Sequence, residues 1–203
     1  MKKKVAVAMS GGVDSSLTAA LLIEQGYDVI GVTMTLSDES REAGGSTAVS
    51  DAKKVADALN IPHYVVNYHK KFKDDVIKYF ISEYAKGRTP NPCVRCNNTV
   101  KFGSLLKDCL ELGADCVATG HYARIEQDEK TGRYLLKKGL DVRKDQSYVL
   151  YTLTQDVLKH FILPLGNYSK EKTRELAGKM NLPVISLKVR RFVLFQMMTI
   201  KLI

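Results

Sequence analysis

Two short segments of the chain carry residue types that could do chemistry. The first, residues 10–16, reads Ser-Gly-Gly-Val-Asp-Ser-Ser: its glycines let a ligand approach the backbone, and its hydroxyl groups can donate hydrogen bonds. This composition indicates a phosphate cradle, although it lacks the Walker pattern G-x-x-x-x-G-K-[ST]. The second segment, Cys93-Val94-Arg95-Cys96, places two thiols three residues apart. Thiols at this spacing serve redox or persulfide chemistry, or form half of a zinc site.

A strand and a helix must position the first segment. Residues 4–9 are apolar and β-branched, which is typical of a buried parallel strand, and residues 17–23 have helical composition that ends near Gly26. The segment is therefore predicted to be a strand-to-helix turn. Such a turn offers free N–H groups and the positive end of the helix dipole to an anion. An ordinary Gly-Ser turn before a capped helix is the competing interpretation.

Strands and helices alternate along the following chain. Strands are predicted at residues 27–34, 62–66 and 115–122, and helices at 52–59 (capped by Ser50 or Asp51), 72–84 and 103–112. This alternation predicts an α/β fold, a doubly wound parallel sheet that binds its ligand at the carboxyl ends of the strands. We expect residues 37–50 to form a polar loop, residues 87–102 to form an extended loop fixed by two prolines, residues 133–138 to form a hairpin strand, and the segment up to Met180 to be rich in helix.

The surroundings of the thiol pair favour a reactive thiolate. Arg88, Arg95 and Lys101 are close in sequence and are expected to lower the pKa of a thiol. A zinc site would need a second pair of ligands, and Cys109 and Cys116 have the wrong spacing for one. We expect these two cysteines to be small buried apolar residues.

Composition bounds the class of protein. The 203 residues are 45% hydrophobic, enough for one sizeable core, and the formal charge of +9 is a modest indication of a polyanionic partner. Four cysteines without a secretory signal predict free thiols in the cytoplasm. No run of 18 apolar residues occurs, so we expect no membrane span.

Residues 10–15 resemble the PP-loop of the ATP pyrophosphatase superfamily, whose members bind ATP, release pyrophosphate and leave AMP on an oxygen of the other substrate. Three more segments narrow the resemblance to the tRNA-specific 2-thiouridylases: 88–103, 118–124 and 144–148. The four motifs occur in the right order and cover roughly residues 1–185. The resemblance implies a PP-loop ATP pyrophosphatase fold, adenine nucleotide α-hydrolase-like, followed by the start of a small helical domain.

The resemblance also implies an activity and its residues. The family replaces the C2 oxygen of the wobble uridine of tRNA with sulfur, by adenylation of that oxygen and attack by a cysteine persulfide. Cys96 matches the nucleophile. The matching ATP contacts are Ala8, Met9, Ser10, Gly11, Gly12, Val13, Asp14, Ser15, Met34 and Gly120. The matching tRNA contacts are Asn91, Pro92 and Cys93, at the target base, and Lys144, Asp145 and Gln146.

Further expectations concern cofactors and partners. ATP is expected with Mg²⁺, for which Asp14 is a candidate ligand. The partners implied are tRNA and a sulfur-donor protein that carries a persulfide. Many relatives have Asp at the position of Cys93, so we assign Cys93 a base contact and no proton transfer. His121 is interpreted either as an acid or base or as a structural histidine.

The resemblance divides the chain into residues 1–148, the ATP-binding domain, residues 149–184, the beginning of a helical tRNA-binding domain, and residues 185–203, an aberrant tail. The resemblance leads us to expect that the chain lacks the family's second catalytic cysteine and its β-barrel domain. A one-base deletion near Val184 would explain the tail, because the shifted frame permits the family's Ser-Gln-Glu-Ile-Cys-Phe motif there, and sequencing the locus tests this hypothesis. Two alternatives remain open: a non-catalytic remnant that binds ATP and tRNA, and an ATP pyrophosphatase that acts on a small molecule.

Overall fold

A central parallel sheet organises the fold. The computed structural model describes residues 2–36 and 48–183. The five strands lie in the order β3-β2-β1-β4-β7 and all pair in parallel. Their bounds are Lys4–Ala8 (β1), Asp28–Thr35 (β2), His63–Asn67 (β3), Cys116–Ala118 (β4) and Phe161–Ile162 (β7). The predicted α/β class is thereby confirmed.

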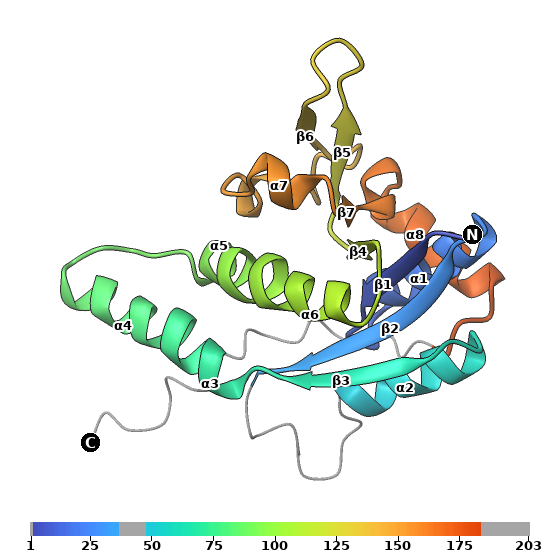
Figure 1. Cartoon of the computed structure of the whole chain (residues 1–203), viewed down its shortest axis with the longest axis horizontal. Helices are drawn as coiled ribbons and strands as arrows, with labels where there is room; N and C mark the ends of the chain where they lie inside the picture. The colour runs from blue at the N-terminus through green and yellow to red at the C-terminus, as the bar shows by residue number, and fades with distance from the viewer. Residues whose placement is uncertain (1, 37–47, 184–203) are drawn as a thin grey trace.

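A separate antiparallel hairpin, β5 (Ala123–Gln127) with β6 (Tyr134–Lys138), projects away from the sheet and its helices (Figure 1). Its two strands are joined by a turn that Asp128 stabilises, because its side chain accepts bonds from Lys130 N at 3.1 Å and Thr131 Oγ1 at 2.7 Å. The expected hairpin strand at residues 133–138 is confirmed.

Helices cover both faces of the sheet. They are α1 (Val13–Glu24), α2 (Ala48–Ala58), α3 (His69–Phe72), α4 (Lys78–Ala85), α5 (Pro92–Cys96), α6 (Leu105–Glu111), α7 (Gln155–Leu158) and α8 (Lys170–Lys179). Two π-helical stretches, η1 (Lys73–Ile77) and η2 (Asn97–Ser104), join α3 to α4 and α5 to α6, and two 3₁₀ turns are η3 (Ser147–Val149) and η4 (Pro164–Asn167). Within residues 2–36 and 48–183, no helix is long and apolar enough to cross a bilayer.

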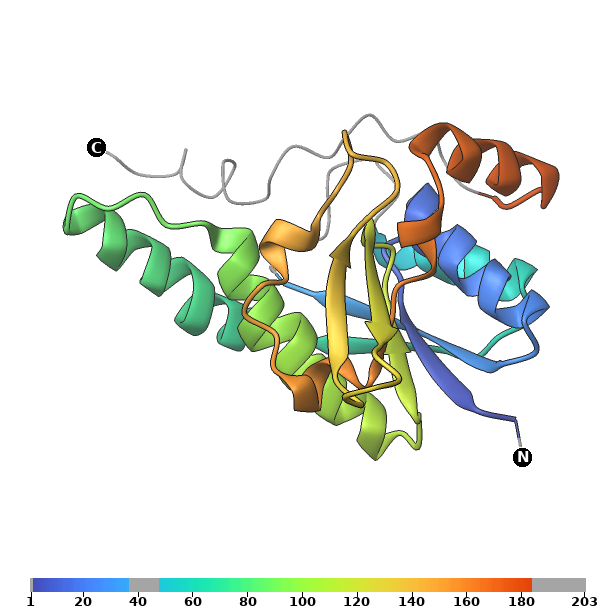
Figure 2. The ribbon, with the colours of Figure 1, turned by 90° about the horizontal axis from the view of Figure 1, so that it is seen from above.

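The alternation of side chains along β1 divides the core into two layers. Val5 and Val7 pack with Val55 on the side of α1 and α2, whereas Ala6 packs with Leu105 on the other side. Figure 2 shows α4, α5 and α6 (green) on one side of the sheet and α1 (blue) and α8 (red) on the other. Residues that alternate along a strand point to opposite faces, so a strand buried on both faces is apolar throughout.

Two predictions about local structure are wrong. Helix α2 begins at Ala48, so Ser50 and Asp51 lie within its first turn and do not precede it. Residues 87–102 do not form one extended loop, because Pro92 is the first residue of α5. Proline is well tolerated there, since the first N–H group of a helix has no partner within the helix.

Strand β7 was not expected at all. Its two residues pair with Val117 and Ala118 of β4 and add the fifth strand of the sheet. The division of the chain into domains stays a prediction. The polar loop expected before Ala48 falls largely on residues 37–47, and the expected aberrant tail on residues 184–203, and both segments lie outside the described residues.

Candidate active site

The Ser-Gly-Gly-Val-Asp-Ser segment forms the turn between β1 and α1, as predicted. Gly12 is the N-cap residue of α1, and no side chain caps this helix end. The Ser15 hydroxyl holds the turn together: it accepts a bond from Ser10 N at 3.1 Å and donates one to Gly12 O at 3.1 Å. The N–H groups of the first helical turn therefore remain available to an anion, which the helix dipole also favours.

Gly11 brings the turn close to α2. Its φ is +71°, and a Cβ atom built there would lie 2.4 Å from Asp51 Cβ and 2.8 Å from Ala52 N. Any side chain at this position would push the turn away from α2. Both the backbone conformation and the close approach thus require glycine.

Gly120 and Met34 lie at the same edge of the sheet as the turn. A Cβ atom on Gly120 would lie 3.0 Å from Asp14 C and 3.1 Å from Ser15 N, so the loop after β4 packs directly on the first turn of α1. Met34 is near the carboxyl end of β2, which is paired with β1. The structure therefore brings together every residue that the sequence proposed for ATP, from Ala8 to Ser15 with Met34 and Gly120.

Asp14 meets two side chains that sequence reasoning missed. Its Oδ1 atom accepts hydrogen bonds from Tyr122 OH at 2.8 Å and from Lys170 Nζ at 2.5 Å. The ammonium group of Lys170 also lies 5.6 Å from the centroid of the Tyr122 ring. Burial, with a contribution from Asp14, raises the pKa of Tyr122, so its phenol stays protonated. Lys170 is 156 residues away in sequence and belongs to no motif, so no sequence signal could have found it.

The fit of the turn to Mg²⁺ rests on Asp14. Both hydrogen bonds to the Asp14 carboxylate end on its Oδ1 atom. In the described part of the chain, no three His, Cys, Asp or Glu side chains form a group that could hold a metal ion. Mg²⁺ in nucleotide sites is commonly held by one or two carboxylates together with the phosphates of the substrate. A single carboxylate beside a phosphate cradle suits that arrangement.

The thiol pair lies on α5 and not on an extended loop. Asn91 caps this helix, because its Oδ1 accepts bonds from Cys93 N at 3.0 Å and Val94 N at 3.3 Å. Cys93 and Cys96 are free and half-buried against the core layer that contains Ala6 and Leu105. Burial raises the pKa of both thiols, and the positive charge of Lys101 opposes this rise without cancelling it.

The expected lowering of the thiol pKa is wrong, because burial raises the pKa of Cys93 and of Cys96 and two of the three expected cations bind elsewhere. The Arg88 guanidinium pairs with Glu83 at 2.9 Å. Arg95 Nε donates to Asp75 O at 3.0 Å, and its guanidinium lies 4.9 Å from the centroid of the Tyr79 ring. Both cations are engaged elsewhere, so Lys101 alone of the three opposes the rise in thiol pKa. Cys109 and Cys116 are buried, as predicted.

A contact between two aromatic rings connects η2, which continues α5 (the thiol helix), with the loop that packs on the turn between β1 and α1 (the phosphate turn). Phe102, on the continuation of α5, lies 5.8 Å from His121, measured between ring centroids, and His121 follows Gly120 directly. His121 is buried, with Nδ1 2.7 Å from Thr119 Oγ1, and burial lowers its pKa to about 3. The histidine is therefore neutral near pH 7, which favours the structural interpretation over the acid or base.

The segment expected to contact tRNA, residues 144–146, is hydrogen-bonded to Tyr122, the residue after His121. Tyr122 N donates to Gln146 Oε1 at 3.0 Å, and Gln146 N donates to Tyr122 O at 2.9 Å. Asp145 accepts bonds from Gly139 N at 2.9 Å and Ser147 Oγ at 2.7 Å. The side chains of Asp145 and Gln146 thus stabilise the loop, and Lys144 is the exposed member of the three.

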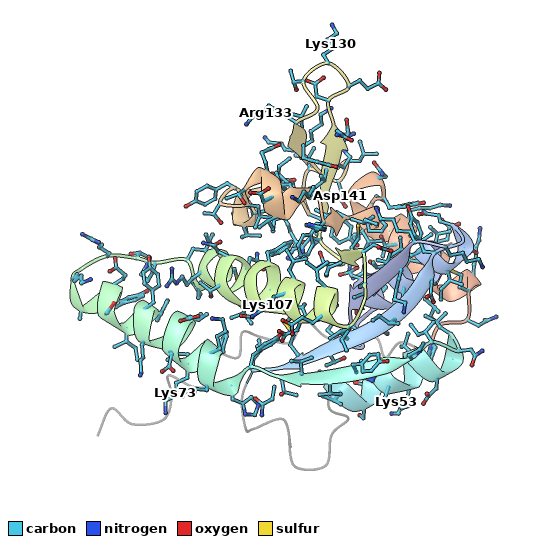
Figure 3. All side chains as sticks on the ribbon, in the orientation of Figure 1. Lys53, Lys73, Lys107, Lys130, Arg133 and Asp141 are labelled. Carbon is cyan, nitrogen blue, oxygen red and sulfur yellow. The ribbon has the colours of Figure 1, made fainter. Side chains whose placement is uncertain are left out.

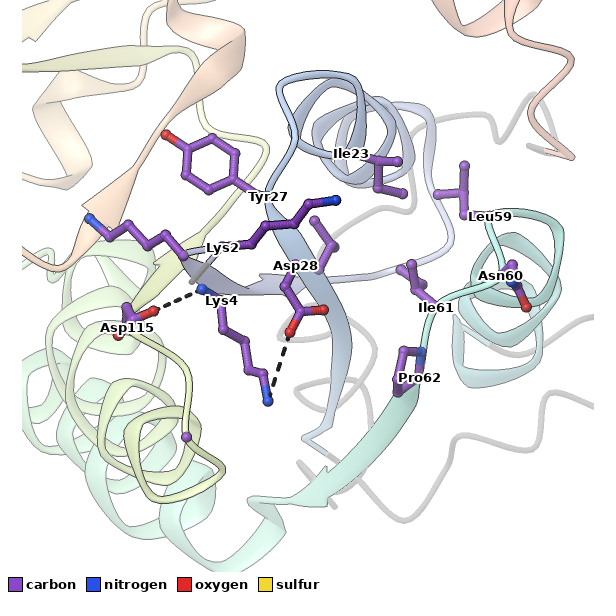
Figure 4. Close-up of a pocket in the computed structure, with 13 residues that line it drawn as sticks. Lys2, Lys4, Ile23, Tyr27, Asp28, Leu59, Asn60, Ile61, Pro62 and Asp115 are labelled. Carbon is purple, nitrogen blue, oxygen red and sulfur yellow. Dashed lines mark hydrogen bonds and ion pairs between the residues drawn. The ribbon is translucent and has the colours of Figure 1, made fainter.

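A cavity at the other end of the sheet is a weaker candidate. It lies at the amino ends of β1 and β2 and is lined by Lys4, Tyr27, Asp28 and Asp115, among others (Figure 4). Lys4 N donates to Asp115 Oδ2 at 2.8 Å there. Ligands of open α/β sheets bind at the carboxyl ends of the strands, so the turn after β1 is the better site.

A parallel α/β sheet with this glycine-serine turn at its carboxyl edge defines an ATP-binding domain of the PP-loop class, with an adenine nucleotide α-hydrolase-like fold. The family model described as the tRNA methyl transferase HUP domain matches residues 3–190. The chain belongs to this family.

Curated relatives carry a more specific name. The chain is 58% identical over 192 residues to tRNA-specific 2-thiouridylase MnmA 1 of Caldanaerobacter subterraneus subsp. tengcongensis, which covers 91% of this chain and 53% of the relative. It is 56% identical over 189 residues to the tRNA-specific 2-thiouridylase MnmA of Carboxydothermus hydrogenoformans. The match covers 89% of this chain and 52% of that relative. The expected homology with 2-thiouridylases is confirmed, and the chain spans about half the length of these relatives.

Solved structures support the fold. The U34-tRNA thiolase NcsA of Methanococcus maripaludis superposes with a TM-score of 0.57 at 20% identity, covering 94% of this chain and 61% of that one. A 4-thiouridine synthetase solved with RNA and bound ATP gives a TM-score of 0.58 at 20% identity. The match covers 89% of this chain and 41% of the synthetase chain. At this level of identity the likeness concerns the fold alone.

Proposed function

We propose that this chain is the ATP-binding part of a tRNA uridine 2-sulfurtransferase, which replaces the C2 oxygen of the wobble uridine with sulfur. The observation that carries the proposal is the contact between Phe102, on the helical segment that continues α5, and His121, which follows the Gly120 that packs on the phosphate turn. The identity with named 2-thiouridylases supports the choice of substrate. A cytoplasmic location accords with this function.

The first half of the reaction belongs to the turn after β1. The C2 oxygen of uridine is a poor leaving group. Transfer of AMP from ATP to this oxygen releases pyrophosphate and turns the oxygen into part of a good leaving group. The free N–H groups of α1 and the hydroxyl of Ser10 suit the phosphates. Mg²⁺, when bound, neutralises phosphate charge, and Asp14 is the carboxylate of the turn that would hold it.

The second half needs sulfur chemistry at α5. A persulfide, delivered by a sulfur-donor protein, carries its terminal sulfur to C2, and AMP leaves with the former C2 oxygen. A thiolate then attacks the carrier sulfur, which forms a disulfide and releases the thiocarbonyl on the base. We assign Cys96 as the nucleophilic cysteine, one of the two thiols that take part in these persulfide and disulfide steps. Its half-buried position protects a reactive sulfur species from water.

Several exposed groups near this edge suit tRNA. Tyr148 and Tyr151, which flank the buried turn residue Val149, are 63% and 71% exposed, and exposed aromatic rings can stack on unpaired bases. Lys130 and Arg133 stand at the tip of the projecting hairpin (Figure 3), where they can meet phosphates. Asn91, Pro92 and Cys93 lie at the start of α5, and we assign them the contact with an extruded base.

A second candidate function is activation without thiolation. The chain has four cysteines, and two of them, Cys109 and Cys116, are buried in the core. Cys93 is therefore the one other thiol that α5 offers as a partner for Cys96. Three residues apart on a helix places Cβ atoms roughly 5–6 Å apart, wider than the roughly 3.5–4.5 Å that a disulfide needs. Because Cys-X-X-Cys pairs of redox proteins do form disulfides, completion of the reaction depends on whether the first turn of α5 can bring the two thiols together.

Mass spectrometry of digested tRNA separates these functions. Unmodified tRNA with a wobble uridine is incubated with the chain, ATP and a persulfide donor, and 2-thiouridine and pyrophosphate are both measured. Pyrophosphate together with 2-thiouridine that disappears in Cys96→Ser supports the full reaction. Pyrophosphate without 2-thiouridine supports activation alone. Pyrophosphate that needs no tRNA points to a small-molecule substrate and rejects the proposal.

A further inference from the structure

The phosphate turn lacks a cation of its own. Residues 5–23, which comprise β1, the turn and most of α1, contain no Lys or Arg. Walker-type turns carry within the motif a lysine that reaches the terminal phosphates. A polyphosphate in this turn would also meet the carboxylate of Asp14, which repels it. A positive charge from another part of the chain would add to that of Mg²⁺ at this place and offset the repulsion by Asp14.

We propose that Lys170 supplies this charge and is a phosphate-binding residue of the nucleotide site. Its ammonium group lies 2.5 Å from Asp14 Oδ1, in the first turn of α1, and its side chain is 19% exposed. An ammonium group has three N–H donors, so Lys170 can keep its bond to Asp14 and still donate to a phosphate oxygen. This inference rests on the proposed binding of ATP at the same turn.

The position of Lys170 is not explained by the stability of its own helix. It is the first residue of α8, where the helix dipole disfavours a positive charge. The chain nevertheless fixes this residue: its backbone N donates to Asp141 Oδ2 at 3.0 Å, and Asp141 is buried. The bond from Lys170 N lowers the pKa of Asp141, which therefore stays ionised. These contacts orient the ammonium group toward α1.

Tyr122 defines the path of the lysine side chain. Its ring lies beneath the Lys170 ammonium group, and its hydroxyl group bonds the same Asp14 oxygen. The tyrosine oxygen also lies 3.1 Å from Thr173 Oγ1, one turn further along α8. The start of α8 is thus held against the phosphate turn by several bonds, and Lys170 is the cation that these bonds place there.

Calorimetric titration of ATP, AMP and inorganic pyrophosphate tests the assignment. Loss of a charge-assisted hydrogen bond weakens binding by roughly 10–150-fold. We expect Lys170→Met to weaken ATP and pyrophosphate by such a factor and AMP by less than about threefold, and Lys170→Arg to retain most of the affinity. Lys172→Met is the matched control, because Lys172 lies on the same helix and pairs with Glu175. It should leave all three affinities within about twofold.

A double variant distinguishes direct contact from charge neutralisation. If Lys170 only cancels the charge of Asp14, Asp14→Asn combined with Lys170→Met should, in titrations without Mg²⁺, bind pyrophosphate as the wild type does. If Lys170 contacts phosphate, as we propose, the double variant should remain weak. Restored binding in the double variant, or equal losses for AMP and pyrophosphate in Lys170→Met, would overturn the inference.

Chemical acetylation of the unaltered chain gives a test that needs no variant. Pyrophosphate should slow acetylation of Lys170, followed by mass spectrometry, and should leave Lys172 unaffected. If the wild type binds ATP and pyrophosphate but Lys170 is not protected, the inference fails and the proposed function stands. If the wild type binds neither ligand, the proposed function itself fails.

Discussion

Substitution of Gly11 by alanine should damage the phosphate turn more than any comparable change elsewhere. Two costs add at this position. The backbone has φ of +71°, where an alanine costs roughly 1–2 kcal/mol. The added Cβ would lie 2.4 Å from Asp51 Cβ and 2.8 Å from Ala52 N, and overpacking of this kind costs about 1–3 kcal/mol.

The sum is about 2–5 kcal/mol, a large share of the roughly 5–15 kcal/mol that stabilises a typical domain. Two glycines provide matched controls. Gly26 has φ of +86° and nothing within 4 Å of an added Cβ, so Gly26→Ala should show the conformational cost alone. Gly12 lies in the same turn, and its added Cβ would meet Ser10 Oγ at an ordinary 3.5 Å, so Gly12→Ala should cost no more than about 1 kcal/mol.

Urea unfolding of the three variants measures these costs, and titration with ATP shows how far the turn has moved. The expected order of destabilisation is Gly11→Ala, then Gly26→Ala, then Gly12→Ala, with ATP affinity lost in Gly11→Ala and kept in Gly26→Ala. Equal stability of the Gly11→Ala and Gly26→Ala variants would show that α2 does not press on the turn, and the steric argument would be refuted.

Two further predictions concern Asp14 and His121. Asp14→Ala should abolish tRNA-dependent pyrophosphate release and lower the melting temperature only slightly, because Asp14 is partly exposed; release at the wild-type rate, measured by a coupled phosphate assay, would contradict its role. Burial lowers the pKa of His121 to about 3, below its unfolded value near 6.5, so the native state binds fewer protons than the unfolded state there. The stability due to this histidine is complete above pH 6.5 and is lost as the pH falls, by up to about 1.4 kcal/mol per pH unit. His121→Asn should flatten that fall in urea titrations between pH 6.5 and 4.5, and an unchanged slope would mean that another group titrates.

The parts of the fold that the sequence predicts best are those whose pattern is local. The run of apolar residues at 5–9 is largely buried, with side chains on both faces of the sheet, so its composition alone identifies β1. The turn after it depends on glycines and serines that are adjacent in the chain. Strand β7 escapes such reasoning because Phe161 and Ile162 are too few to form a pattern.

The predictions that fail depend on which partner a side chain binds in the folded chain, whether that partner is near or far in sequence. The sequence predicts that Pro92 is part of an extended loop, but the Asn91 side chain caps a helix that begins with this proline. Arg88 and Arg95 were expected beside the thiols, but Glu83 and the backbone of Asp75 bind them. Lys170 reaches Asp14 through the packing of α8 on α1, which no spacing along the chain reveals. The roles of the individual site residues stay predictions until they are measured.

We propose above that this chain uses ATP to activate the wobble uridine of tRNA. The most direct measurement is the rate of pyrophosphate release with two transcripts of one tRNA, identical except that the wobble uridine is replaced by cytidine in the second. We expect release with the uridine transcript and a rate at background with the cytidine transcript, and neither transcript should support release in Asp14→Ala. Equal rates with both transcripts, or an equal rate with no tRNA at all, would contradict it.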